Sequence, residues 1–377
     1  MSGKVRFIDA QKSQFYSTVR GRVNDYFKEQ RLSKNANALM YFKTTFFLGG
    51  LIFIYCLILS NKFNPLFMFL LAILLGMFTA FVGFNVCHDA IHGAYSSKSY
   101  VNRALGYVFN ILGANAYVWN ISHNIIHHTY TNISGHDGDI EIAPGLIRVT
   151  HEDKIFKIQM YQHIYAFLLY GFASLAWVFN KDYQLIHKNN LGGLNLKHPQ
   201  NEIVKMYFFK AVYYFLFIVL PLLILKLSWW QFIIGFVAMH LVEGWIMGIV
   251  FQLAHVVEDS DFPIPTSDGN IEEAWAVHQM RTTANFSKDN GWITWFCGGL
   301  NMQIEHHLFP KICHVHYPKI SVIVEQTAKE FNVPYLANKT IFDAVRSHYK
   351  MLRKFGVDAQ GNQDKVVDNE FHNLNLK

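Results

Sequence analysis

Long apolar runs separated by short polar turns dominate the pattern along the chain. Because the hydrocarbon core of a bilayer is roughly 30 Å thick, a spanning helix needs about 20 mostly apolar residues. Two weaker apolar segments, residues 104–119 and 165–179, carry more polar or small residues, and we expect helices that lie at the membrane interface or pack under the cytoplasmic part. The pattern therefore predicts an all-α integral membrane fold. The four predicted transmembrane helices cover residues 44–60, 65–85, 206–225 and 229–254.

The strong spans pair into two hairpins with short turns at residues 61–64 and 226–228, and each turn holds one lysine. Most other basic residues gather in the N-terminal arm, the central loop and the C-terminal third. Basic loops tend to stay on the cytoplasmic side, so we expect both termini and the large loops to form a helical cytoplasmic cap that holds the active site. We expect one domain over residues 1–377, with an N-terminal arm (1–40) that lacks a signal-peptide core and a polar tail (356–377).

Composition agrees with a membrane protein and narrows the partners. The chain is 51% hydrophobic and 16% aromatic, with only 16% charged residues. Its formal net charge of +6 is explained by basic cytoplasmic loops and requires no nucleic acid. The four cysteines form no CxxC motif, which is typical of a reducing compartment. We therefore expect the lipid membrane as a partner and no nucleic acid.

Histidines cluster just outside the predicted spans. They occur in four stretches: "CHDAIHG", "SHNIIHHTY", "FQLAHVVE" and "NMQIEHHLF". In the last of these, the motif begins with Gln303. A spacing of i, i+4 places two imidazoles on one helix face, one turn apart, as in other helical metal sites. Eight histidines exceed what one tetrahedral zinc needs, so two metal ions fit better. The candidate ligands are His88, His92, His123, His127, His128, His255, His306 and His307.

The predicted topology gives an independent test of this clustering. If the two weak segments do not cross the membrane, all the histidine clusters lie on its cytoplasmic side. Any single histidine is more often a hydrogen-bonded packing residue than a ligand, and His278, His314 and His316 are interpreted in that way. His240 and Glu243 lie inside the fourth span, where ionisable residues are costly and often functional. They either line a substrate path or pack within the helix bundle.

The order His-x-x-x-His, His-x-x-x-His-His, Gln-x-x-His-His along two membrane hairpins resembles the membrane fatty acid desaturase family, from about residue 40 to 340. Because its third motif begins with glutamine, the chain resembles the front-end subgroup of this family. The resemblance implies a non-haem di-iron centre with two Fe ions held by the eight histidines, with His255 as the additional ligand after the last span. It also implies O2 as co-substrate. Gln303 stands where other subgroups have histidine, and its role stays open.

The resemblance further implies an acyl substrate, carried by CoA, a carrier protein or a phospholipid. Acidic residues lie beside each motif, and we expect Asp89 and Asp139 to support the ligand histidines, with Asp137, Glu258 and Glu305 as further candidates. Trp119, Trp245, Trp292 and Trp295 are candidates either for the acyl slot or for interfacial anchoring.

Many front-end desaturases carry a fused cytochrome b5 domain with a His-Pro-Gly-Gly motif, whereas this chain has only "HPQN" at His198. We therefore expect electrons from a separate ferredoxin or free cytochrome b5, which would dock on basic residues within 181–197 or 311–319. Two alternatives stay open. One is a di-iron hydroxylase of a fatty acid, sphingolipid or carotenoid. The other is a metal transporter, which would place more ionisable residues within the spans.

Overall fold

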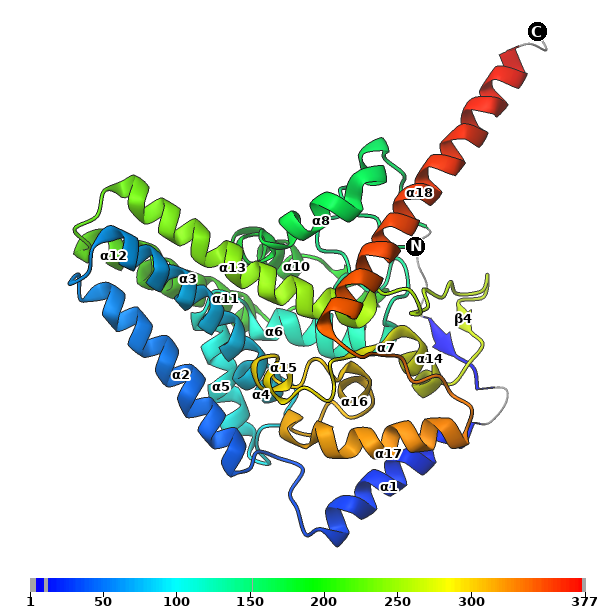
Figure 1. Cartoon of the computed structure of the whole chain (residues 1–377), viewed down its shortest axis with the longest axis horizontal. Helices are drawn as coiled ribbons and strands as arrows, with labels where there is room; N and C mark the ends of the chain where they lie inside the picture. Colours follow the sequence, from blue (N-terminus) through cyan, green and yellow to red (C-terminus); the bar gives the residue numbers. More distant parts are fainter. Residues whose placement is uncertain (1–4, 10–12, 151, 375–377) are drawn as a thin grey trace.

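The computed structural model describes residues 5–9, 13–150 and 152–374, with side chains described as far as Val357. Four helices are long and apolar enough to cross a membrane: Ala38–Leu59, Pro65–Ile91, Gln200–Ile224 and Trp229–His255. Each contains or closely overlaps one predicted span, so the positions of the four predicted spans are confirmed as candidate spans. In Figure 1 these helices form the left part of the molecule, and shorter helices gather at their histidine-bearing ends.

The bounds of the described elements follow the chain order. The α-helices are α1 (Phe15–Glu29), α2 (Ala38–Leu59), α3 (Pro65–Val82), α4 (His88–Ile91), α5 (Ser99–Ile111), α6 (Ala116–Trp119), α7 (His128–Tyr130), α8 (Gln162–Tyr170), α9 (Ala173–Ala176), α10 (Asp182–Ile186), α11 (Gln200–Tyr214), α12 (Leu220–Ile224), α13 (Trp229–His255), α14 (Trp275–Thr282), α15 (Gly291–Phe296), α16 (Gln303–Leu308), α17 (Tyr317–Glu330) and α18 (Ile341–Leu374). Two 3₁₀ turns, η3 (Lys157–Tyr161) and η6 (His314–His316), precede α8 and α17.

Four π-helical turns interrupt or join these helices, and two of them lie at the histidine motifs. The turns are η1 (Gly83–Cys87), η2 (Asn120–His127), η4 (Trp177–Lys181) and η5 (Phe215–Val219). A π turn widens the helix locally and is frequent at functional sites. Six two-residue strands also pair, which the all-α prediction did not include: β1 (Arg6–Phe7) with β4 (Asn270–Ile271), β2 (Asn190–Leu191) with β3 (Leu194–Asn195), and β5 (Asn285–Phe286) with β6 (Ala337–Asn338).

Local sequence sets where the first two spans begin. The Asn37 side chain accepts a hydrogen bond from the backbone N–H of Met40 and caps α2. Asn64 does the same for α3, and Pro65 occupies the first turn of that helix, where its missing N–H costs nothing. The turn between α2 and α3 closes through Asn61, which has a positive φ of 56°. These caps position the start of α3, whose far end carries the first histidine motif.

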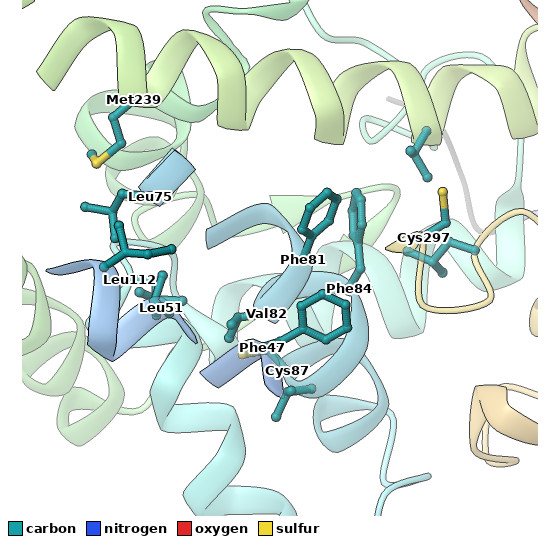
Figure 2. Close-up of a cluster of buried hydrophobic side chains, with 14 of the residues drawn as sticks. Phe47, Leu51, Leu75, Phe81, Val82, Phe84, Cys87, Leu112, Met239 and Cys297 are labelled. Atoms are coloured by element: carbon teal, nitrogen blue, oxygen red, sulfur yellow. The ribbon is translucent and has the colours of Figure 1, made fainter. Parts of the chain in front are cut away.

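The spans pack through small residues and an apolar cluster. α3 packs against both α2 and α13, and at Gly76 a Cβ atom would collide with the backbone of Met239 on α13. Close approach of helix backbones at glycine is the usual way in which membrane helices associate. Figure 2 shows the cluster that fills the space between these helices, including Phe47, Leu75 and Phe81. The core therefore reaches from the spans to the helix ends that bear histidines.

The helices outside the spans build a second core. On α1, Phe15, Val19, Val23 and Phe27 recur every four residues and are buried against α17 and α14. This amphipathic helix lies in the N-terminal arm that the sequence predicted, and Figure 1 shows it beside α17. The backbone of α18 stays helical to Leu374, through most of the predicted polar tail.

The weak segment at residues 165–179 forms a sharply bent helix pair. Residues Lys157–Tyr170 and Ala173–Ile186 meet at an angle of 72°, which fits either a broken span or a re-entrant loop. The inward side of α8 is polar: the Gln162 side chain hydrogen-bonds the backbone of Arg148, and the Tyr170 hydroxyl contacts His348. Its outward side is apolar, with Ile164 64% and Leu168 70% exposed. A helix with polar contacts on its inward side and apolar residues on its outward side suits a lipid environment.

Candidate metal centre

The structure brings the eight predicted histidines into one buried cluster. His88, His92, His123 and His306 form one set, in which one ligand nitrogen from each lies within 4.8 Å of the others. We call these four the cavity-side group. His127, His255 and His307 form a second set by the same measure, which we call the inner group. His128 approaches His306 and His307, so it lies between the two groups.

Elements that are distant in sequence deliver these rings. His88 begins α4 directly after η1, and His255 is the last residue of α13. The η2 turn carries His123 and His127 with their rings stacked 4.9 Å apart at 22°. The short helix α16 supplies both His306 and His307, whose rings are nearly perpendicular at 88°. This divergence of adjacent histidines directs one ring to each group.

Hydrogen bonds fix the outer nitrogen of most of these rings. Nδ1 of His123 lies 3.0 Å from Asp139, and Nδ1 of His127 lies 2.8 Å from Asp137. A carboxylate only accepts, so each imidazole places its N–H at Nδ1 and its lone pair at Nε2. Nδ1 of His255 similarly contacts the carbonyl of Thr282 at 3.3 Å.

The remaining outer contacts come from α14 and α17. Nδ1 of His307 lies 2.7 Å from the Gln279 side-chain oxygen, and Nδ1 of His306 lies 3.2 Å from the Tyr317 hydroxyl. The Thr131 hydroxyl also donates to the Gln279 oxygen, which steadies it. Each of these groups orients an imidazole without facing the interior of the cluster.

The inner nitrogens have the opposite character. Among the described residues, none forms a hydrogen bond to the buried Nε2 atoms of His92, His123, His127, His128, His255, His306 and His307. Buried polar atoms are normally satisfied, so converging lone pairs of this kind fit metal ions. An outer contact at Nδ1 and a free Nε2 is also the usual arrangement of ligating histidine. The residues present therefore fit two metal ions, and an all-imidazole donor set suits iron.

Burial keeps most of these rings in the form that binds metal. Desolvation lowers the pKa of His92, His123, His128, His306 and His307 well below the usual range. These imidazoles are therefore neutral near neutral pH, as a metal ligand must be. His127 differs: burial alone would lower its pKa, but the Asp137 carboxylate more than offsets that effect and raises it.

Asp89 supports His88 through a chain that starts in the first span. Oδ1 of Asp89 lies 3.8 Å from Nδ1 of His88, and Oδ2 lies 2.9 Å from Nδ1 of His314. On its other side, His314 contacts the ammonium of Lys43 at 2.8 Å between Nε2 and Nζ. Lys43 is only 3% exposed and lies over the Trp295 ring. His314 thus lies directly behind the acid that flanks His88.

The other acidic candidates occupy different environments. Glu305 is fully buried, accepts hydrogen bonds from Asn285 and Tyr335, and holds α16 against the strands β5 and β6. Burial raises the pKa of Glu305 to about 7. Glu258 was a further candidate for supporting a histidine, and the structure does not bring it to the cluster. Its side chain is 43% exposed and pairs with Lys350, because the chain leaves the cluster as soon as α13 ends.

A mostly apolar cavity of about 150 Å³ opens beside the cavity-side group. His88, His123 and Gln303 line it where it meets the cluster, and Gln303 Oε1 has no hydrogen-bond partner among the described residues. Asp139, Glu141 and Lys181 form its polar rim, with Lys181 3.2 Å from Asp139. The rest of the wall is mostly apolar and includes Phe109, Trp119, Trp177 and Phe251.

The aromatic and intramembrane candidates separate in the structure. Trp119 lines the cavity. Trp245 and Trp292, by contrast, are 50% and 75% exposed, and neither lines the cavity, so of the two alternatives interfacial anchoring remains for both. They lie on outward helix faces. Trp295 packs against Phe42, Phe46 and Phe47.

His240 and Glu243 are buried between α13, α9 and α11. Nδ1 of His240 contacts Ser174 at 2.8 Å and Nε2 contacts Tyr213 at 2.7 Å. Glu243 lies 3.5 Å from His240 and lines a second, smaller cavity.

Several supporting residues were not predicted from the sequence. Gln279, Thr282 and Lys43 lie 28, 27 and 271 residues from the histidines they contact, whereas Tyr317 follows His306 by eleven. Asp137 was noted but not favoured over Asp139. The only local signal for Asp137 was its position in "GHDGDIE", five residues after Asn132. Its carboxylate accepts a hydrogen bond from the backbone N–H of Asn132 at 2.9 Å.

Comparison with known proteins agrees with this geometry. The model of the fatty acid desaturase family matches residues 63–339. An acyl-lipid (8-3)-desaturase from Physcomitrium patens is 36% identical over 94% of this chain and 74% of its own length. The sn-1 linoleoyl-lipid 6-desaturases of Synechocystis sp. and Arthrospira platensis are 35% and 34% identical, each over 92% of this chain and over 96% and 94% of their own lengths. The chain therefore belongs to the fatty acid desaturase family and is an oxidoreductase of the membrane.

Proposed function

We propose that this protein introduces a double bond toward the carboxyl end of a lipid-linked acyl chain, using O2 and two Fe ions held by the eight histidines. The observation that carries the proposal is the contact between the histidine cluster and an apolar cavity, in which His88 and His123 belong to both. Relatives that act on acyl lipids support the substrate class, because their similarity covers more than nine tenths of this chain.

When bound, the iron pair supplies the oxidising power that removes hydrogen from an unactivated methylene. The protein itself positions the acyl chain and the imidazoles, and it excludes water from the site. The apolar wall holds the chain straight past His88 and His123, and the outer hydrogen bonds keep the imidazoles fixed. We infer that Gln303 contacts the acyl chain or a bound water at the junction, since it lines the cavity and its side-chain oxygen has no hydrogen-bond partner among the described residues.

We propose that the polar rim of Asp139, Glu141 and Lys181 receives the carboxyl end of the substrate. The rim lies beside His123, so few carbons separate the head group from the metals. That arrangement favours a double bond near the carboxyl end, as in front-end desaturation. Gln303 at the start of the third motif supports the same regioselectivity.

We propose that the spans form two hairpins with the termini, the histidine cluster and the cap on the cytoplasmic side. The basic residues outside the spans support this orientation. The bent pair would then be a re-entrant element, whose exposed Ile164 and Leu168 contact the acyl chains of the cytoplasmic leaflet. Electrons would arrive from a separate ferredoxin or cytochrome b5 at the cytoplasmic face.

Heterologous expression tests the proposal directly. Cells that express the chain are fed defined fatty acids, and double-bond positions in their lipids are read by mass spectrometry. We expect a new double bond on the carboxyl side of an existing one, with the products in membrane lipids. A hydroxylated product would instead support the hydroxylase. The proposal would be contradicted if the lipid profile of the cells stayed unchanged although the protein purified from them carried iron. Family membership argues against the metal transporter.

A further inference from the structure

A half-buried tryptophan outside the cavity touches the backbone of the histidine cluster directly. The indole N–H of Trp275, the first residue of α14, donates to the carbonyl of His128 at 3.0 Å. His128 is the histidine that lies between the two groups. One hydrogen bond and the covalent bonds of a single residue therefore join the indole to an imidazole at the centre of the cluster. Figure 1 shows α14 beside α7, which begins with His128.

Tyr16 of α1 makes a second contact of this kind. Its ring meets the Trp275 ring edge-on, with centroids 5.5 Å apart at an angle of 82°. Its hydroxyl lies 3.5 Å from the carbonyl of Leu308, the residue that follows His306 and His307. Both side chains are half-buried, so they connect the outside of the helical cap with the backbone that carries the ligand histidines.

The helix that begins with Trp275 also supports the inner group. Gln279, one turn further along α14, is the residue whose side-chain oxygen lies 2.7 Å from Nδ1 of His307. Ala276 and Met280 of the same helix are buried in the second core. One well-packed helix therefore fixes both the indole and a histidine contact, and it holds them in a constant relation to each other.

This side of the cluster is not the side that the acyl cavity occupies. Trp275 and His128 do not line the cavity, whereas Trp119, which stacks on His123 at 4.2 Å, does. Trp119 is also only 7% exposed. A bound acyl chain would cover Trp119 and leave Trp275 open to a protein that approaches from outside.

Positive charges lie next to Tyr16. Arg20, one turn further along α1, is exposed. Burial raises the pKa of Tyr16, and the charge of Arg20 opposes that rise, which places the guanidinium near the hydroxyl. Lys311, also exposed, follows Phe309, whose ring stacks on Tyr16 with centroids 6.4 Å apart. These charges favour a partner with an acidic face.

Two acidic residues precede Trp275 on its other side. Glu273 is paired with Arg281 at 3.4 Å, and Glu272 is exposed. The positive charge is therefore greatest over α1 and the turn that holds Lys311, so an acidic partner would be drawn to that edge of the two rings.

From this arrangement we propose that an acidic one-electron carrier protein docks over α1 and α14, and that Trp275 passes each electron from it to His128. The inference rests on the proposed function and adds the entry point of the electrons to it. Of the two basic segments that could receive the donor, it selects residues 311–319 over residues 181–197. Lys181, which begins the other segment, belongs to the polar rim of the cavity.

Two encounters close the electron count. Each carrier molecule is oxidised by one electron, and two of them supply the two electrons that the reaction needs. With two protons from solvent and the two hydrogen atoms taken from the acyl chain, these electrons reduce O2 to two molecules of water. Trp275 ends each transfer unchanged. Because electron tunnelling falls steeply with distance, a short bonded path from the surface is the most effective one.

The test measures reduction of the iron separately from catalysis. Purified, iron-loaded protein is mixed without oxygen with reduced ferredoxin or reduced cytochrome b5, and oxidation of the carrier is followed by its absorbance. Trp275→Phe keeps a ring beside Tyr16 and removes the N–H, whereas Trp275→Ala removes both. We expect both variants to lose most of the reduction rate and to keep the wild-type iron content.

Two controls separate electron delivery from damage to the site. Dithionite is a small reductant that needs no docking face, and it should reduce the Trp275 variants at the wild-type rate. Trp292→Phe is the matched substitution, since this tryptophan is 75% exposed on an outward helix face. It should accept electrons from the carrier as the wild type does.

Charge reversal tests the docking face. Arg20→Glu combined with Lys311→Glu should slow reduction by the carrier about tenfold at low salt, because electrostatic steering raises association rates by at least that factor. Added salt should narrow the difference, since it screens exposed charges. Lys197→Glu makes the same change on the other basic segment and should leave the rate unaltered.

The outcomes separate the two proposals. Slow reduction by a carrier together with normal reduction by dithionite supports the route through Trp275. Iron-loaded Trp275 variants that accept electrons from the carrier at the wild-type rate overturn it, and so does equal slowing with dithionite. Slowing by Lys197→Glu alone, or a wild-type protein that neither carrier reduces, also overturns it. Chemically reduced wild-type protein that consumes O2 and forms no double bond contradicts the proposed function instead.

Discussion

The two histidine groups differ in what surrounds them. In the inner group, His127, His255 and His307 each have Nδ1 tied to a protein oxygen, and none of the three lines the substrate cavity. In the cavity-side group, His123 and His306 are also tied, at 3.0 Å and 3.2 Å, but His88 and His123 form part of the cavity wall, and the Asp89 contact to His88 is long at 3.8 Å. The comparison suggests a division of work. We infer that the inner group would hold a metal more firmly, and that the cavity-side group would face the acyl substrate proposed above.

Removing one ligand from each group should have the largest effect. We expect His307→Ala and His88→Ala each to reduce desaturation to background, because each ring belongs to a set of nitrogens that could hold a metal. The comparison predicts unequal iron contents: His307→Ala should lose more iron, since it also frees Gln279 and disturbs the inner group. Iron per chain, measured on purified proteins, checks this. Equal iron loss in both variants would remove the distinction between the groups.

The carboxylates behind the groups should have the next largest effect. Asp137→Asn removes the charge that fixes the His127 tautomer, and we expect iron affinity to fall about 10- to 100-fold, as for other partners of ligating histidines. Asp89→Asn should cost less, because its contact to His88 is longer. Competition with a graded chelator measures both affinities. If Asp89→Asn weakened binding more than Asp137→Asn, the inner group would not be the firmer one.

Lys43 acts on the cavity-side group only through two intermediates. Lys43→Met should therefore lower activity by a few-fold and keep about two irons per chain, because the imidazoles themselves are untouched. We expect the spectrum of the iron centre to change, since the orientation of His314 and Asp89 depends on the ammonium. Lys43→Arg should partly restore the wild-type spectrum. An unchanged spectrum with reduced activity would mean that Lys43 serves only to stabilise α2.

The smallest effect is expected at Glu258. Its pair with Lys350 is exposed, and such pairs contribute roughly 0–1 kcal/mol. Glu258→Gln should leave iron content and product profile at wild-type values. A loss of iron in this variant would show that proximity in sequence to His255 matters after all.

Sequence spacing was sufficient for features that repeat along one element. Apolar runs of the right length located the spans, and the spacing of His88 and His92 placed both rings on one side of α4. These inferences succeed because helix geometry alone relates such residues.

Contacts between elements that are distant in the sequence could not be predicted from it. Lys43 meets His314 across 271 residues, and Gln279 meets His307 from a separate helix. Adjacency was also misleading: Glu258 follows His255 by three residues but points outward once α13 has ended. The π turns were not anticipated either, because their wider winding is set by tertiary packing rather than by a recognisable residue pattern.

The metal content of the purified wild-type chain is the most direct test of the central claim. Elemental analysis together with Mössbauer spectroscopy should find about two iron ions per chain in a coupled, nitrogen-rich environment, as expected for two imidazole groups that share one buried cluster. A single metal ion per chain, or a full load of zinc that supports activity without iron, would contradict the account.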